Sequence, residues 1–319
     1  MIKLYDENLT GYIEAEVEDF YCNDFPHFFA RIDKDSYVRW IGEPIYNVPE
    51  MCKGSQPTDD GNLIIEAEDY DDFITREPNA KKYIKRLIGS KEFIHKLPRY
   101  CLWLVDCPPN EIRKMPLVYK RVEKVREFRL KSKKAATRRD AVTSWLFQEI
   151  RQPKTNYLLV PSVSSERREY IPIGYMHADT IASNLVLIVP DAKYWDFGVL
   201  TSSVHMTWMR LVAGRLRNDY RYSIDVVYNN FVFSPFWKKV ERTAAEILVA
   251  RNKFPEASYA DLYDPLLMPK ELRRAHEEND RAVMEAYDFP KNMSELQMQR
   301  ALLKIYERVK NFREFYDSL

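Results

Sequence analysis

Glycine is scarce in this chain of 319 residues, which contains only eight, and no two glycines are separated by a single residue. Loops that cradle dinucleotides, nucleotide phosphates or S-adenosylmethionine need closely spaced glycines, because the backbone must approach the ligand without side chains. The sequence therefore predicts no cofactor site in this chain.

Cysteine is also scarce, with Cys22, Cys52, Cys101 and Cys107 forming neither a Cys-x-x-Cys pair nor zinc-finger spacing with a histidine. This excludes a metal-binding motif and a disulfide framework, and it indicates a reducing cytoplasm. No apolar run approaches the length of about 18 residues that spans a membrane. Residues 1–10 are polar and acidic, unlike an export signal, so we expect no membrane partner.

No charge of either sign dominates, since 49 Lys and Arg stand against 48 Asp and Glu, but the distribution is uneven. Acidic clusters occupy residues 14–19 and 66–72, whereas residues 113–139 are strongly basic. Such a surface suits a phosphate backbone, and an ordinary solvated helix face is the alternative. Candidate phosphate contacts in the run are Lys131, Lys133, Lys134 and Arg138.

Hydrophobic periodicity predicts an α+β fold with three parts. Residues 1–36 are aromatic and acidic without a clear period, which indicates a connector. Residues 37–234 mix both kinds of element, and residues 235–319 form a small all-α domain. Expected strands cover 100–105, 157–160, 170–173 and 185–189, and expected helices cover 81–88, 115–132, 240–251, 272–287 and 296–309.

Common hydrolytic motifs are missing: the chain has no Gly-x-Ser-x-Gly, no His-Glu-x-x-His and no Glu-x-Lys. The five histidines are scattered. An unrecognised enzyme would have to use Glu149, Glu166 or His205, and their spacing forms no acid–base constellation.

Residues 201–223 contain the most informative polar segment. Ser202 or Ser203 can cap a short helix that Gly214 ends. The loop after this helix contains several guanidinium, carboxylate and hydroxyl groups within a few positions, of the kind that read base edges and hold phosphates. A salt-bridged structural loop is the alternative. The residues are Arg215, Arg217, Asp219, Arg221, Tyr222 and Ser223.

A second polar cluster, at residues 164–168, lies between expected strands and offers Ser164, Ser165, Arg167 and Arg168. Its hydroxyls and guanidinium groups can bind phosphate or a carboxylate, and ion pairing within the fold is the alternative.

Several runs resemble one family over residues 38 to 290. They include Asp60-Gly-Asn-Leu63, Arg99-Tyr-Cys-Leu-Trp-Leu104, Val163-Ser-Ser-Glu-Arg-Arg168, Gly214-Arg-Leu216 and Asp219-Tyr-Arg-Tyr-Ser223. The chain resembles the C-terminal half of the MmeI-like (type IIL) restriction-modification enzymes and related adenine-specific DNA methyltransferases.

That resemblance implies a target-recognition domain followed by a helical C-terminal domain, in the cytoplasm of a bacterium or archaeon. The implied partners are double-stranded DNA and a methyltransferase domain or subunit missing from this chain. S-adenosylmethionine would belong to that missing part, which would methylate adenine at N6, so this chain alone is not expected to be catalytic. The alternative is an autonomous, non-catalytic DNA-binding or specificity subunit.

The resemblance further implies that Arg217 and Asp219 read one base pair, while Asn218 between them has a less defined role in reading it. Arg217 can donate to guanine O6 and N7 while Asp219 accepts from the paired cytosine N4, so we expect a G·C pair. Two positions depart from the family pattern: Ser162, where a basic residue is common, and Val232, where proline is common.

Overall fold

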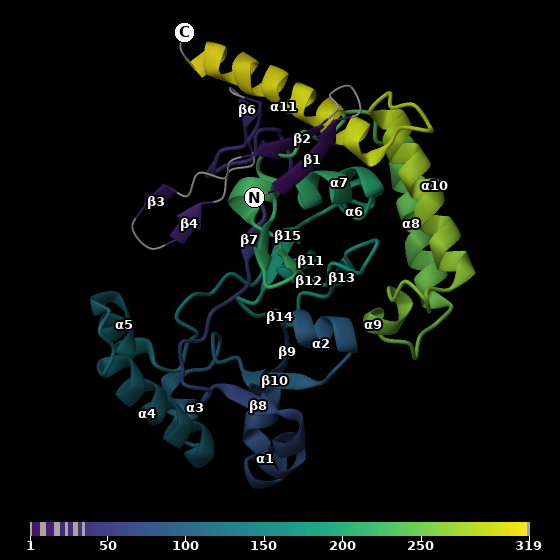
Figure 1. Ribbon diagram of the computed structural model, residues 1–319. Coiled ribbons are helices and arrows are strands. Elements are labelled where there is room, and N and C mark those ends of the chain that lie inside the picture. The colour runs from purple at the N-terminus through teal and green to yellow at the C-terminus, as the bar shows by residue number, and fades with distance from the viewer. Residues whose placement is uncertain are drawn as a thin grey trace.

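The structure is a computed structural model that describes residues 2–6, 11–15, 20–22, 25–27, 31–33 and 36–317, with side chains for 38–311. Within the predicted connector, residues 1–36, positions 1, 7–10, 16–19, 23–24, 28–30 and 34–35 lie outside the described residues. Its described backbone forms antiparallel pairs: β1 (Ile2–Asp6) with β2 (Gly11–Ala15), β3 (Phe20–Cys22) with β4 (Phe25–His27), and β5 (Arg31–Asp33) with β6 (Ser36–Tyr37). The expected α+β class is confirmed (Figure 1).

The central sheet is antiparallel, in the order β13 (Gly174–Met176), β11 (Tyr157–Pro161), β15 (Val186–Pro190), β7 (Cys52–Lys53). Every residue of β11 is buried, which explains its unbroken apolar run. The strand expected at 170–173 is wrong, because this segment enters the core as irregular chain and β13 begins only at Gly174. Pro172 has no N–H to donate to a ladder.

A second sheet has the order β14 (Ile181–Ala182), β9 (Ile84–Ile88), β10 (Arg99–Leu102), β8 (Ile64–Glu66). The helix expected at 81–88 is wrong. A short 3-10 helix, Pro78–Tyr83, leads into β9, which pairs with strands on both sides and buries Leu87 and Ile88. Strand pairing and burial here outweigh local helical periodicity.

The two sheets meet where the chain leaves β7. Ser55 bridges to Ser183, and its N–H donates to the Ala182 carbonyl at 2.7 Å. A β-carbon at Gly54 would lie 2.3 Å from the Ser183 carbonyl oxygen, so only glycine permits this approach. The contact fixes one sheet against the other.

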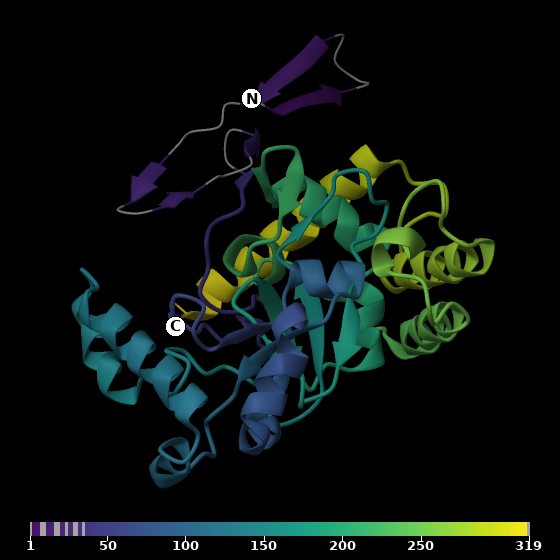
Figure 2. The same cartoon turned by 90° about the horizontal axis from the view of Figure 1, so that it is seen from below.

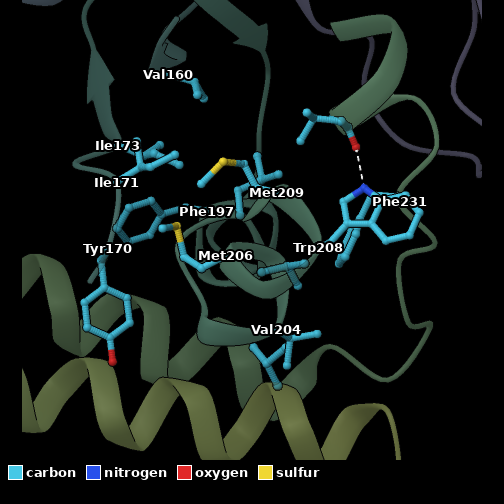
Figure 3. Close-up of a cluster of buried hydrophobic side chains, with 14 of the residues drawn as sticks. Val160, Tyr170, Ile171, Ile173, Phe197, Val204, Met206, Trp208, Met209 and Phe231 are labelled. Carbon is cyan, nitrogen blue, oxygen red and sulfur yellow. Dashed lines mark hydrogen bonds between the residues drawn. The ribbon is translucent and has the colours of Figure 1, made fainter. Parts of the chain in front are cut away.

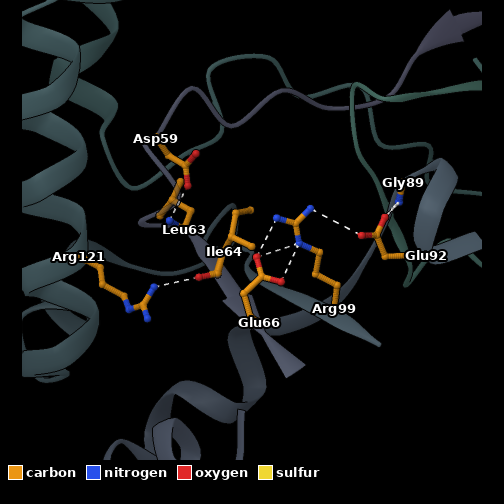
Figure 4. A network of polar contacts seen from close by, with 8 residues as sticks. All are labelled: Asp59, Leu63, Ile64, Glu66, Gly89, Glu92, Arg99 and Arg121. Carbon is orange, nitrogen blue, oxygen red and sulfur yellow. Dashed lines mark hydrogen bonds and ion pairs between the residues drawn. The ribbon is translucent and has the colours of Figure 1, made fainter. Parts of the chain in front are cut away.

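Charged side chains hold helix α2 (Ser90–His95) against the second sheet (Figure 4). Arg99 pairs with Glu66 of β8 at 2.8 Å and reaches Glu92 of α2 at 3.8 Å. Glu92 also accepts a hydrogen bond from the Gly89 N–H at 2.9 Å, which satisfies a donor at the start of the helix.

The remaining helices around this sheet are α1 (Tyr70–Arg76), a 3-10 helix at Ala67–Asp69, α3 (Pro109–Ile112), α4 (Pro116–Leu130), α5 (Ala135–Arg139) and a 3-10 helix at Asp140–Thr143. Helix α4 agrees with the helix predicted for 115–132. It buries Val118, Val122 and Val125, at helical spacing, in the second sheet's core.

The largest core surrounds α7 (Ser203–Val212), with α6 (Tyr194–Leu200) beside it (Figure 3). Trp208 of α7 is 1% exposed, and its indole N–H donates to the Val227 carbonyl at 2.9 Å. The core continues into α8 (Lys238–Asn252), α9 (Tyr259–Leu262), α10 (Lys270–Ala286) and α11 (Glu295–Asp317). Helices α8, α10 and α11 match the three expected C-terminal helices, and the short α9 was not expected. The boundary at 234/235 remains a prediction.

Helices α8 and α10 lie side by side in both views, with α11 across α7 (Figures 1 and 2). Thr243 of α8 donates to Asn279 of α10 at 3.0 Å, and Asn279 donates in turn to the Gly198 carbonyl of α6 at 2.7 Å. Buried polar groups thus fix the packing of all three helices. Within the described part of the chain, no helix is long and apolar enough to cross a membrane.

Arg129, at the end of α4, is fully buried although it belongs to the basic run. Its guanidinium donates five hydrogen bonds to backbone carbonyls, at distances of 2.7 to 3.3 Å. The acceptors belong to Pro57, Thr58, Asp140, Thr143 and Leu146. Arg129 therefore links α4 to residues 57–58 and to residues 140–146. Its guanidinium is not available to a phosphate.

Replacing Arg129 with methionine removes these donors and leaves buried carbonyls unpaired, which is expected to lower the free energy of unfolding by about 3–5 kcal/mol. Chemical denaturation measures this loss. The matched control is Arg126→Met, because Arg126 is exposed and only 3.8 Å from Glu123; its change should stay within about 0.5 kcal/mol. Equal losses in the two variants would contradict the structural role of Arg129.

Candidate nucleic-acid interface

A small hairpin carries the predicted base-reading residues. Strand β16 (Gly214–Leu216) pairs with β17 (Asp219–Arg221), and β12 (Val163–Ser164) lies on the other side of β17. Leu216 pairs with Asp219, so Arg217 and Asn218 form a two-residue turn. The two polar clusters predicted from sequence therefore meet in one three-stranded sheet.

Alternation along β17 separates its side chains onto two faces. Tyr220 is buried and pairs with Arg215 and Ser164, whose side chains share its face. The Arg215 guanidinium stacks 3.8 Å above the Tyr220 ring. Asp219 and Arg221 must then project from the opposite face, where Arg221 is exposed and Asp219 half-buried.

Arg217 occupies the hairpin tip in a left-handed conformation, with φ of +58°. Two-residue hairpins require positive φ at their first central position, which usually selects glycine or asparagine. An arginine there costs roughly 1–2 kcal/mol of backbone strain. The Arg217 side chain is exposed and forms no hydrogen bond or ion pair with the described residues. Strain of this kind is typical of functional positions.

Arg168 ends the 164–168 cluster. Its half-buried guanidinium interacts electrostatically with Asp219 and with Asp264, which follows α9. Burial lowers the pKa of Arg168 from its usual value, while the two carboxylates act in the opposite direction. The charge of Arg168 is thus felt both at the hairpin and at the start of the C-terminal helical part.

Tyr222 and Ser223 support the hairpin from inside the fold. The Tyr222 hydroxyl is hydrogen-bonded to His205 Nε2 at 2.8 Å, and both side chains are buried. The Ser223 hydroxyl accepts from the Val226 N–H at 3.3 Å and so caps the π-helical turn Ile224–Tyr228. Ser202 caps α7 in the same way, accepting from the His205 N–H at 3.2 Å, as the sequence predicted.

The Ser164–Arg168 cluster divides between the interior and the surface. Ser164 is 3% exposed, and its hydroxyl has no hydrogen-bond partner among the described residues. Ser165 accepts from the Arg167 N–H at 3.4 Å within a tight turn, and Glu166 lies 3.8 Å from Arg215. Arg167 is exposed. The ion-pairing alternative therefore applies to Glu166 and Arg215, while Arg167 faces solvent.

The basic run is also divided. Arg129 is buried, and Arg121 donates to the Asn62 and Ile64 carbonyls at 3.1 and 2.9 Å, so these two arginines are engaged within the fold. Arg138 donates to the Ser132 and Lys133 carbonyls and closes the α4–α5 turn. The exposed basic side chains of the run are Arg113, Lys114, Lys120, Lys124, Arg126, Lys131, Lys133, Lys134, Arg138 and Arg139.

The residues considered for an unrecognised enzyme have other roles. His205 is fully buried against Tyr222, Glu149 pairs with Arg151, and Glu166 lies near Arg215. The part of the chain with described side chains also has no group of three or more His, Cys, Asp or Glu placed to hold a metal ion.

Sequence reasoning missed the left-handed turn and the Arg168 connection. The turn had a local signal, because Arg217 and Asn218 separate two strand-like triplets and asparagine is common in such turns. The electrostatic interaction of Arg168 with Asp264 had no local signal in the sequence, since about a hundred residues of chain lie between the two.

Residues 33–235 match the model of the MmeI target recognition domain, and residues 236–312 match that of the MmeI C-terminal domain. DNA methyltransferase A of Bacillus subtilis (strain 168) is 38% identical over 271 residues, covering 84% of this chain and 31% of that protein. The chain thus spans less than a third of that relative.

A solved structure of the type IIL restriction-modification enzyme MmeI in complex with DNA is also similar. It has a TM-score of 0.86 and 37% sequence identity, and the match covers 97% of this chain and 45% of the MmeI chain.

Replacing Arg217 with glycine tests the strain at the turn. Relief of roughly 1–2 kcal/mol of strain is offset by about 0.5–1 kcal/mol of extra freedom in the unfolded chain. The unfolding midpoint should therefore stay equal or rise. Arg215→Gly is the matched control and should lower stability, because it removes the stacking on Tyr220 from a strand. A clear loss in Arg217→Gly would contradict the strained turn.

The buried His205 makes stability depend on pH. Burial lowers its pKa to about 3, so the folded protein keeps it neutral while the unfolded chain protonates it near pH 6.5. Its contribution is present above that pH and is lost as pH falls, by about 2 kcal/mol at pH 5. Denaturation at pH 7 and pH 5 should show that His205→Gln loses less stability than the wild type. Identical losses would show that His205 is not held neutral.

Proposed function

Since this chain belongs to the MmeI target recognition domain family, we propose that it binds a specific duplex DNA sequence and presents it to an adenine-N6 methyltransferase domain or subunit. The observation that carries the proposal is the hairpin tip. Arg217, Asp219 and Arg221 lie within five residues, and neither arginine side chain is engaged by the described residues. Polar groups held in place without internal partners are suited to an external ligand.

The hairpin has the size and chemistry for the major groove of DNA. That groove admits a two-stranded β-ribbon. In this arrangement Arg217 donates to guanine O6 and N7, and Asp219 accepts from the N4 amino group of the paired cytosine. A good pair of this kind discriminates against other bases by roughly 1–3 kcal/mol. Arg167, Arg168 and Arg221 would contact phosphates or support the loop.

The residues present support DNA binding by this chain and cofactor binding by the methyltransferase part. S-adenosylmethionine supplies the methyl group when it is bound to the methyltransferase part. The hairpin and the 164–168 cluster offer exposed guanidinium, carboxylate and hydroxyl groups and no paired glycines, so they do not fit that cofactor. This chain's residues bind and orient the duplex, so that an adenine can be turned out of the stack elsewhere.

Selection of duplexes from a random pool tests the proposal. The wild type should enrich an asymmetric motif that contains a G·C pair. The double variant Arg217→Glu, Asp219→Arg exchanges donor and acceptor, and it should enrich a motif with that one pair inverted. Sequencing after selection at low and moderate salt gives the result.

The control is a second charge exchange of the same size, Lys239→Glu with Glu285→Lys, on the ion pair between α8 and α10. It should enrich the wild-type motif. A wild type that enriches no motif, although it binds DNA, would refute sequence recognition by this chain. An unaltered motif in the Arg217 and Asp219 double variant would refute the assignment of readout to the hairpin.

A further inference from the structure

Helix α4 carries a row of lysines that base reading does not use. Lys120, Lys124 and Lys131 follow one another at spacings of four and seven residues, and all three are exposed. At 100° per residue they lie within about 40° of one another around the helix axis. Lys131 directly follows the last residue of α4 and extends the same face.

The row points away from the protein's interior. Val118, Val122 and Val125 define the buried side of α4, and Arg129 is buried on the same side. The same helical geometry places the centre of the row about 150° from the centre of this buried side. Helices α4 and α5 stand at one edge of the molecule in both views, so this face is open to a large ligand (Figures 1 and 2).

The charge of the row is only partly balanced by its own helix. Glu123 lies three residues after Lys120 and is 3.8 Å from Arg126. Glu127 lies three residues after Lys124 and four before Lys131, and it forms no ion pair within the described part of the chain. Beyond the helix end, Lys133, Lys134 and Arg139 add exposed positive charge around α5. The surface is thus cationic over both helices.

We infer that this lysine row binds the phosphate backbone of the DNA that flanks the sequence read by the hairpin. This inference rests on the proposed function. The row is about 16 Å long, at 1.5 Å per residue, which corresponds to a rise of about five base pairs along the duplex axis at 3.4 Å each. Lysines in a row supply point charges without a planar fork, so they suit phosphates rather than base edges. The row adds affinity and leaves sequence preference unchanged.

Dependence of DNA binding on salt tests the inference. Each phosphate contact contributes about 0.9 to the slope of log affinity against log salt concentration. The triple variant Lys120→Gln, Lys124→Gln, Lys131→Gln should therefore lower the magnitude of this slope by about 2 to 3. Affinity should fall by the same factor for the selected motif and for random duplexes, and selection should return the wild-type motif.

The matched control removes three exposed lysines from the C-terminal helical part, Lys238, Lys270 and Lys291, each replaced by glutamine. Its slope should equal that of the wild type. An equal fall in both variants would mean that only net charge matters and would overturn the inference, as would an unchanged slope in the α4 variant. In both of these outcomes the wild type still enriches its motif, so the proposed function stands. Loss of the motif in the wild type itself would instead refute the proposed function.

Discussion

Burial of Tyr220 and Tyr222 is the constraint on which the proposed interface depends. Tyr220 lies in β17 and Tyr222 directly follows it, so both side chains point to the same, buried face of the strand. Asp219, before Tyr220, and Arg221, between the two tyrosines, must therefore face outward. A shift of one residue would bury the charges and expose the rings. The hydrogen bond from Tyr222 to the buried His205 secures this register, because an unpaired buried hydroxyl would cost more than 1 kcal/mol.

The C-terminal helices are hydrogen-bonded to the segments that support the hairpin. Asp280 of α10 accepts hydrogen bonds from the Tyr170 hydroxyl and from the Ser203 N–H at the start of α7, both at 2.7 Å. Burial raises the pKa of Asp280 to about 6. One carboxylate therefore links α10 to the segment that follows the 164–168 cluster and to the helix that leads into the hairpin. Buried hydrogen bonds of this kind help to hold the hairpin in one position.

The basic run shows how neighbouring residues of one type take different roles. Arg121 and Arg129 satisfy buried carbonyls with guanidinium groups, whereas Lys120, Lys124 and Lys131 remain in solvent. A guanidinium has five donors and can be fully hydrogen-bonded inside a protein, while a lysine ammonium is strongly hydrated. Among the basic side chains of α4, only those of Arg121 and Arg129 reach buried or half-buried positions, while Arg126 and the lysines are exposed.

Sequence alone determined the α+β class, helix α4, a serine cap at residue 202 or 203, the three long C-terminal helices and the family, because local periodicity, capping and motifs carry these features. Structure at 81–88 and at 170–173 was decided by pairing and burial instead. Likewise, only the tertiary structure showed that Ser202 is the cap, that Arg129 points inward, that Arg217 adopts positive φ and that Arg168 interacts electrostatically with Asp219 and Asp264. These features depend on contacts between distant segments, which no local pattern records.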